Sequence, residues 1–313
     1  MDKLDLKILQ SLDWHGRMPI NRIAKIVHSN KDVVAYRVNK LEKQEIITNY
    51  YPVIDMHKLG YHTSRLYFDL EELDDDETKD FIDFIDKKIN AGLIFWHDYL
   101  PYTCGIFLWN KSVYEVEQAI FKIKRKLGKK LIKYNYSLIS TFRQYPKDYL
   151  FGNPTHTEFR SLEPSKIINH DKNDFNILKL LSKNARISTM EISRKLKIPQ
   201  TTVSKKIKSL EKNKIILGYR AQINITKLNQ INYFLEIYLG SNKNIQDIES
   251  WANVNKHVVW LQKIIGTCDL EVEVEVKNKE ELNKLLNSLR KKFKSIRKIV
   301  FWSQEYKKLT FLP

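Results

Sequence analysis

The chain has 313 residues, of which 42% are hydrophobic and 12% are aromatic, and its formal net charge is +17. This length exceeds what one ordinary core organises, so we expect two or more domains, and the hydrophobic content excludes a disordered tail. The charge favours an anionic partner such as nucleic acid or an acidic membrane surface. Cys104 and Cys268 are too few for a disulfide framework or a four-ligand cysteine site, so we expect a cytoplasmic protein with both thiols filling core space.

The first ten residues, MDKLDLKILQ, place charged side chains between apolar ones at helical spacing. Because this segment has no uninterrupted apolar run, it predicts an amphipathic helix. It predicts neither a signal peptide nor a membrane-spanning segment, so we expect no membrane partner.

The opening segment has a second copy later in the chain. Residues 5–50 align without a gap with residues 174–219 at an offset of 169. Identical pairs at this offset include Asp5/Asp174, Ile8/Ile177, Leu9/Leu178, Leu12/Leu181, Arg17/Arg186 and Tyr50/Tyr219. An offset of 164 then aligns Trp96 with Trp260. The chain is therefore a tandem duplication of a unit of roughly 150 residues, an ordinary domain size.

Each copy opens with three short helical patterns. In the third pattern of the second copy, Val203, Ile207 and Leu210 lie on one face, which leaves hydroxyl and lysine side chains mainly on the other. Three short helices with a tight turn before a hydroxyl-rich third one describe a helix-turn-helix, whose third helix lies in the major groove of DNA. The β-rich stretches 46–54 and 215–223 that follow predict a hinge or wing strand.

The remainder of each copy alternates strands and helices. In the second copy we predict strands at 231–239, 257–265, 268–277 and 296–306, with helices near 245–253 and at 279–293. This βαββαβ order predicts a ferredoxin-like domain. The strict alternation of Glu271-Val-Glu-Val-Glu-Val276 predicts an apolar face against the helices and a glutamate face open to solvent.

The fold expected for the whole chain is therefore α+β, with two copies of a winged helix-turn-helix followed by a ferredoxin-like domain. The Pro-containing polar stretch between the copies predicts a linker. We expect helix-turn-helix domains at residues 1–50 and 170–219, βαββαβ domains at 51–151 and 220–313, and the linker at 152–169.

The second copy is the stronger candidate for binding DNA. Residues 154–313 carry a net charge of +14 against +3 for residues 1–153, and residues 200–214 carry +4 against +1 for residues 31–45. Lysines along a helix are usually only a solvated face, but these coincide with hydroxyl side chains at the helix start. The expected DNA-contacting residues are Gln200, Thr201, Thr202, Ser204, Lys205, Lys206 and Lys208 in the second copy, and Lys31, Tyr36, Arg37 and Lys40 in the first.

These motifs resemble the Lrp/AsnC family of transcriptional regulators over nearly the whole chain. The resemblance rests on TTVSKKIKSLEKNKII at residues 201–216, on Gly266-Thr-Cys-Asp269 between the two central strands, and on the closing KKLTFLP. It implies sequence-specific binding of double-stranded DNA, oligomerisation through the βαββαβ domains, and a small effector, commonly an amino acid, near Gly266 and Asp269. The first copy departs from this pattern and reads Tyr102-Thr-Cys-Gly105 at the turn.

Because the two copies share one chain, we expect them to pair as an intramolecular pseudo-dimer, with homo-oligomers built from such chains. The copies are unequal, so the two halves of the DNA site should differ as well.

Two alternative functions remain open. The same architecture resembles the siroheme decarboxylases, which carry a segment rich in His, Tyr and Arg on the central strands; here only His97 and Tyr99 correspond. A nonspecific architectural DNA-binding oligomer would also account for the basic second half. Since the sequence shows no metal-ligand spacing, nucleophile motif or glycine-rich phosphate loop, we expect no catalytic residue, no metal and no cofactor, and not an enzyme.

Overall fold

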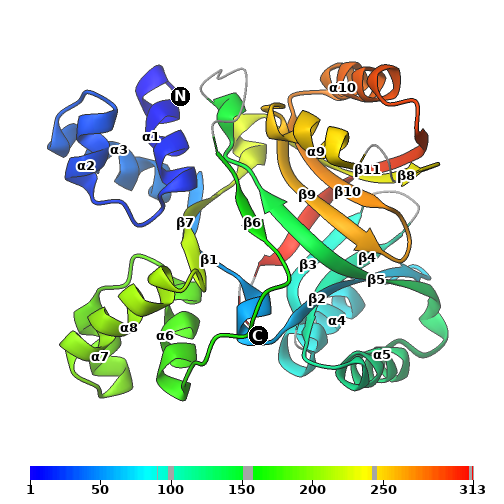
Figure 1. Ribbon diagram of the computed structural model, residues 1–313, viewed down its shortest axis with the longest axis horizontal. Coiled ribbons are helices and arrows are strands. Elements are labelled where there is room, and N and C mark those ends of the chain that lie inside the picture. The colour runs from blue at the N-terminus through cyan, green and yellow to red at the C-terminus, as the bar shows by residue number, and fades with distance from the viewer. Residues whose placement is uncertain (90, 98–101, 151–157, 242–244, 310–311, 313) are drawn as a thin grey trace.

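The computed structural model describes residues 1–89, 91–97, 102–150, 158–241, 245–309 and 312. It has the expected α+β architecture with two similar halves. Figure 1 shows the helix-turn-helix units on one side of the molecule and the sheets with their covering helices on the other.

The helix-turn-helix units have the three short helices that the apolar spacing predicts. The first unit comprises α1 (Lys3–Trp14), α2 (Ile20–Ile26) and α3 (Lys31–Lys43), followed by β1 (Ile47–Ile54) and the 3₁₀ helix η1 (Met56–Leu59). The second comprises α6 (Lys172–Lys183), α7 (Thr189–Leu196) and α8 (Gln200–Lys212), followed by β7 (Ile216–Ile223) and the 3₁₀ helix η4 (Ile225–Leu228). Both α1 and α6 begin with a capping box made by two aspartates, which satisfies backbone N–H groups of the first turn.

The strands and helices that follow are those of two βαββαβ units. The first contains β2 (His62–Leu70), α4 (Asp75–Lys88), β3 (Ala91–His97), β4 (Cys104–Asn110), α5 (Val113–Leu127) and β5 (Leu131–Gln144). The second contains β8 (Ile231–Leu239), α9 (Ile245–Asn253), β9 (Val258–Ile265), β10 (Leu270–Val276), α10 (Lys279–Lys292) and β11 (Ile296–Leu309). The six elements predicted for the second copy are confirmed, and β11 runs three residues beyond its predicted end.

The segment between the copies is not a plain linker. Its described part contains a short strand, β6 (Arg160–Leu162), which pairs antiparallel with the end of β5. Leu162 packs against the apolar cluster between the two sheets. A strand of three residues is too short to show alternation in the sequence, which explains why the prediction missed it.

The described strands of the two halves join into one closed ring. The order is β2-β4-β3-β11-β8-β10-β9-β5, and β5 pairs back with β2. Two long strands close the ring: β5 pairs first with β2 and then with β9, whereas β11 pairs first with β8 and then with β3. The two copies therefore pair with each other inside one chain, while α4 and α5 cover one outer side and α9 and α10 the other (Figure 1).

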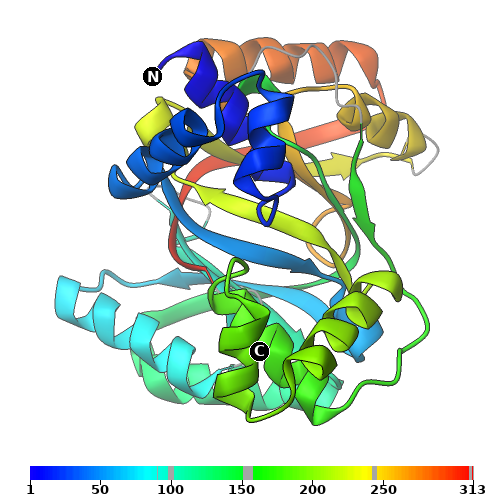
Figure 2. The same cartoon turned by 90° about the vertical axis from the view of Figure 1, so that its left-hand side faces the viewer.

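Strands β1 and β7 form a second, two-stranded antiparallel sheet that connects the halves. We call this pair of strands the ribbon. Figure 2 looks onto the helix-turn-helix side and shows one unit above the other with the ribbon between them. Each helix-turn-helix unit packs against the 3₁₀ helix of the other copy. The core of the second unit includes Met56 and Leu59 of η1, and Ile225 and Leu228 of η4 pack on the core of the first unit.

The glutamate face of β10 is not open to solvent, and that prediction was wrong. Glu271, Glu273 and Glu275 are only 1%, 5% and 3% exposed, because closure of the ring turns this face inward against the sheet of the first copy. Buried carboxylates require partners. Those partners are Arg65 for Glu271, Asn232 and Tyr306 for Glu273, and Lys147 and Tyr149 for Glu275.

The buried carboxyl of Glu273 should make the protein less stable as the pH rises. Burial, together with the neighbouring Glu275, raises the pKa of Glu273 from 4.5 to about 7. The folded protein therefore keeps this proton up to about pH 7, whereas the unfolded chain releases it near pH 4.5. The contribution of Glu273 to stability is accordingly lost between these two pH values, by up to about 3 kcal/mol.

We expect Glu273→Gln to remove this loss, since glutamine has no proton to release and its amide oxygen still accepts from Tyr306. Urea unfolding from pH 4 to 8 should show the variant equal to the wild type at the acidic end and more stable at pH 8. Glu280→Gln, at a position whose side chain is 75% exposed, is the control and should change neither value. Equal pH dependence in Glu273→Gln and wild type would contradict the assignment.

Candidate nucleic-acid interface

Helix α8 presents a polar face to solvent because three apolar residues hold its other side. Val203, Ile207 and Leu210 are at most 6% exposed and belong to the core of the second helix-turn-helix unit. Of the residues predicted to contact DNA on this helix, Gln200, Thr201, Lys205 and Lys208 are exposed and Thr202, Ser204 and Lys206 are half-buried. The side-chain amide of Gln200 donates to Thr189 Oγ1 of α7 at 2.9 Å, which orients it at the tight turn between the two helices.

The corresponding helix of the first copy, α3, has the same pattern of buried and exposed positions. Val34, Val38 and Leu41 are buried, and Lys31, Tyr36 and Lys40 are exposed. Tyr36 is 67% exposed, which is unusual for so large an aromatic side chain. Both predicted helices therefore carry exposed polar groups, and both belong to the helix-turn-helix units that face the viewer in Figure 2.

Two of the predicted DNA contacts are held in ion pairs within the protein. Lys206 Nζ lies 2.7 Å from Asp171 Oδ2 and 3.0 Å from Asp174 Oδ1, and its side chain is 20% exposed. Hydrogen bonding by Lys206 and by the backbone of Asp174 lowers the pKa of Asp171 to about 2. We infer that Lys206 anchors α8 to the capping box of α6, which is a structural contribution to the interface.

Arg37 makes the equivalent contacts in the first copy. Its Nη1 lies 2.5 Å from Asp2 Oδ2 and 3.0 Å from Asp5 Oδ1. The repeated Asp-x-x-Asp at the start of each unit is therefore the sequence signal for both anchors.

Two further arginines fix the helix-turn-helix units against each other. Arg186 donates to the backbone oxygens of Gly16 and Met18, at 2.8 and 3.3 Å, and Arg17 donates to the oxygen of Ile187 at 3.3 Å. Arg17 and Arg186 are an identical pair in the duplicated sequence, so each copy contributes the same contact to the other. Sequence reasoning missed this role, although the retained identity was visible.

The turn predicted to bind an effector is engaged by the protein itself. An ideal Cβ at Gly266 would lie 2.9 Å from the backbone oxygen of Tyr136 in β5, and the φ of Gly266 is +143°, so this position suits only glycine. Asp269 Oδ2 accepts a hydrogen bond from the backbone N–H of Leu239 at 2.7 Å. Gly105 occupies the position in the first copy that Asp269 occupies in the second. An ideal Cβ on Gly105 would lie 2.3 Å from the ring of Phe95, so a side chain at this position would clash with that ring. The effector site at Gly266 and Asp269 stays a prediction.

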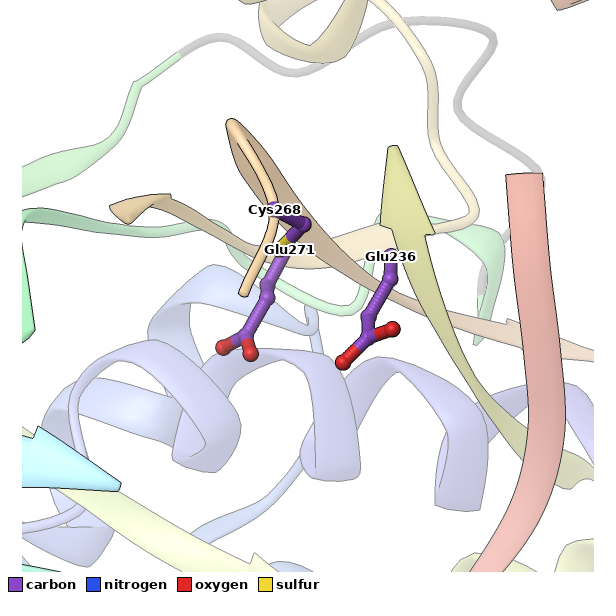
Figure 3. A group of neighbouring side chains, drawn as sticks. All are labelled: Glu236, Cys268 and Glu271. Carbon is purple, nitrogen blue, oxygen red and sulfur yellow. The ribbon is translucent and has the colours of Figure 1, made fainter. Parts of the chain in front are cut away.

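Figure 3 shows a cluster of metal-ligand type inside the ring, made by Glu236 of β8, Cys268 in the turn before β10, and Glu271 of β10. Their potential ligand atoms lie within 4.8 Å of one another, and all three residues are buried. Burial raises the pKa of the Cys268 thiol, which keeps it protonated, and the thiol donates to the oxygen of Leu270 at 3.5 Å. Glu271 pairs with Arg65 at 3.2 Å, and Glu236 accepts from Tyr238 at 2.7 Å. Protein groups thus hold these carboxylates in place.

Comparison with known proteins identifies the helix-turn-helix units. A family model described as winged helix-turn-helix DNA-binding matches residues 1–48 and 170–216, which are the segments of α1–α3 and α6–α8. The chain is 31% identical over 122 residues to an uncharacterised HTH-type transcriptional regulator of Pyrococcus furiosus, and the match covers 38% of this chain and 80% of that protein. It is 30% identical over 126 residues to the HTH-type transcriptional regulator LrpB of Bacillus subtilis, covering 39% of this chain and 81% of that protein.

The chain belongs to the Lrp/AsnC family of transcriptional regulators. Each match has the size of one copy, so this Lrp/AsnC protein is a tandem duplication of the unit that its relatives contain once. It is a DNA-binding regulator of the Lrp type. No helix in the described part of this Lrp/AsnC chain is long and apolar enough to cross a membrane.

The solved structure of the siroheme decarboxylase NirDL matches both halves of the Lrp/AsnC chain together. Its TM-score is 0.61 and its sequence identity 13%, and the match covers 99% of this chain and 92% of that chain. At this identity the likeness shows a shared fold.

Proposed function

We propose that this Lrp/AsnC regulator reads an asymmetric DNA site and that α8 makes the stronger half of the contact. The observation that supports this most is the difference between the N-termini of α8 and α3. The N-terminus of a helix carries partial positive charge and unpaired N–H groups, both of which suit a phosphate.

Helix α8 begins after Pro199 without a side-chain cap, and none of the residues in its first turn is acidic. Helix α3 begins after Asn30, whose side chain accepts from the N–H of Asp32, and Asp32 itself lies in the first turn. A phosphate at α3 would therefore meet a carboxylate and an occupied N–H group. The charge difference of +4 against +1 between residues 200–214 and 31–45 acts in the same direction.

Base reading would come from short polar groups at the start of α8. Gln200 and Thr202 have amide and hydroxyl groups of the kind that contact base edges in the major groove, and Lys205 and Lys208 would contact phosphates. The side-chain contact from Gln200 to Thr189 supports a fixed orientation of the amide before DNA binds.

In vitro selection from a random DNA library is the test, followed by footprinting of the selected site. We expect a site without two-fold symmetry, in which changes to Gln200 or Thr202 relax preference at particular bases by about 1–3 kcal/mol. A palindromic site protected equally in both halves would contradict the asymmetric reading. Equal binding of selected and random DNA at fixed salt would instead favour the nonspecific architectural function.

We also propose that chains associate into homo-oligomers through their sheet domains and act in the cytoplasm. The two cysteines are free and buried, which suits a reducing compartment.

A siroheme-decarboxylase-like activity is the second candidate, because the fold of NirDL matches both halves of this chain. A substrate that loses carboxyl groups carries several carboxylates and needs cationic partners. An apolar hollow lies beside the ribbon and is lined by residues that include Val53, Phe107 and Trp260. Its described lining includes no lysine or arginine. His97 belongs to β3 and Tyr99 lies outside the described residues. We therefore propose that the protein is not an enzyme, and we expect no change in the absorbance of siroheme on mixing.

A further inference from the structure

An apolar hollow lies between the ribbon and the ring of strands. It is lined by residues of β1, η1, β2, β4, β5, β6 and β9, and its cavity volume is about 90 Å³. Most of its wall is aliphatic or aromatic, including Val53, Phe107, Trp109, Ile139, Phe142 and Trp260. A concave, mostly apolar site with a few polar groups is the usual form of a small-molecule site.

One buried polar atom of the hollow's wall, Oε1 of Gln144, has no hydrogen-bond partner among the described residues, and Gln144 is 1% exposed. Nδ1 of His57, also in the wall, makes no hydrogen bond but lies 3.5 Å from Asp55 Oδ1. Native proteins rarely leave buried acceptors unpaired. Since a bound water needs about two to four polar partners and this wall is mostly apolar, a ligand with an apolar body and its own N–H or O–H satisfies the hollow better.

The ligand should carry no charge. Among the described residues that line the hollow there is no Lys, Arg, Asp or Glu, so an ion would lose its hydration without gaining a counter-charge. At the offset of 164, the aromatic Phe107 and Trp109 correspond to Glu271 and Glu273. The second copy therefore cannot repeat this apolar wall, and the asymmetry predicts one such site per chain.

We propose that this hollow binds a small, uncharged aromatic molecule that donates one hydrogen bond to Gln144 Oε1, and that its occupancy changes the affinity for DNA. The second part rests on the proposed DNA-binding function. Residues 51–54 of the wall belong to β1, which begins four residues after α3 ends and pairs along its length with β7, the strand that follows α8. A ligand that moves β1 would therefore alter how the two helix-turn-helix units are placed relative to each other.

Isothermal titration calorimetry of the full chain with indole tests binding, since indole has an apolar bicyclic body and one N–H. We expect saturable binding with one site per chain. Gln144→Leu should weaken it roughly 3- to 10-fold, the range for one lost hydrogen bond. Leu162→Trp, which fills the hollow from the short edge strand β6, should abolish it. Gln230→Leu is the matched control, because Gln230 is also buried with an unpartnered Oε1 but lies outside the hollow's wall.

Fluorescence anisotropy with the selected DNA, with and without indole, tests the coupling separately. A change in DNA affinity that is retained in Gln230→Leu and lost in Leu162→Trp supports the whole proposal. Absence of saturable binding, or equal binding by all variants, overturns the site. If indole binds in the hollow but does not change the affinity for DNA, the binding site stands and only the proposed effect on DNA binding is overturned. If the wild type binds no DNA, the proposed function fails while calorimetry still decides the site.

Discussion

Replacing Lys205 and Lys208 together by alanine should weaken DNA binding roughly 50-fold at about 0.1 M salt. Each lysine that neutralises a phosphate releases condensed counterions, so two such contacts should also lower the slope of log K against log salt by about 2. Both side chains lie on the exposed face of α8. Fluorescence anisotropy over a range of salt concentrations gives affinity and slope together.

The control is a second double variant that also removes two lysines, but at a site away from α8. Lys291→Ala with Lys294→Ala removes two exposed lysines from the end of α10 and the turn after it, in the sheet half of the molecule. We expect at most a small loss of affinity in this variant. If both double variants lose affinity and slope equally, DNA is held by overall charge and α8 has no special role.

Substitution of Lys206, which is held in ion pairs, should have a different effect from substitution of Lys205 or Lys208. Lys206→Ala removes the contacts to Asp171 and Asp174, so it should lower the stability of the second helix-turn-helix unit as well as its affinity for DNA.

Asp13→Ala should destabilise the fold by about 3–5 kcal/mol, the usual cost of leaving one member of a buried ion pair alone. Asp13 is 1% and Arg220 2% exposed, and their side chains are joined by an ion pair of 2.5 Å between Oδ1 and Nη2. Arg220 also donates to the backbone oxygens of Asp13 and Tyr145, at 2.9 and 3.1 Å. This arginine of β7 thereby ties α1 to the end of the first sheet.

Urea unfolding followed by circular dichroism measures the loss. The double variant Asp13→Ala with Arg220→Met removes the uncompensated charge and should recover part of the stability lost in Asp13→Ala. Glu280→Ala breaks an exposed pair with Lys284 and should leave the stability nearly unchanged, because water screens exposed ion pairs. If the double variant is no more stable than Asp13→Ala, the buried charge is not the cause.

The sequence predicted the secondary structure closely, because helical spacing and strand alternation depend only on residues that are near each other in the chain. The apolar spacing of α8 and the alternation of β10 both give the right element. Alternation identifies a strand but not what covers its second face. The environment of Glu271 and Glu273 depends on β5 and β11 joining the two sheets, and this pairing involves residues far apart in the sequence.

The same limit applies to the interface. Exposed lysines and hydroxyls on α8 were predictable from helical spacing, and their positions on the surface agree with it. The ion pairs of Lys206 and Arg37 join the third helix of each unit to the first, so spacing within one helix did not distinguish them from their exposed neighbours. Gln144 and His57 line one hollow only because the ribbon lies over the ring.

The inward faces of the two sheets have become unlike each other. At the repeat offsets of 169 and 164, Arg65 corresponds to Phe234 and Phe107 to Glu271. Arg65 lies across the interface from both residues of the second copy, 3.2 Å from Glu271 and 4.4 Å from the ring centre of Phe234. A dimer of identical chains must present a face that fits itself, so any substitution there appears twice and meets its own copy. Fusion removes this requirement, and each face can accumulate substitutions that only its covalent partner has to accommodate. A free single-unit relative would then lack the matching face for either half, which would insulate this regulator from mixing with relatives in the same cell.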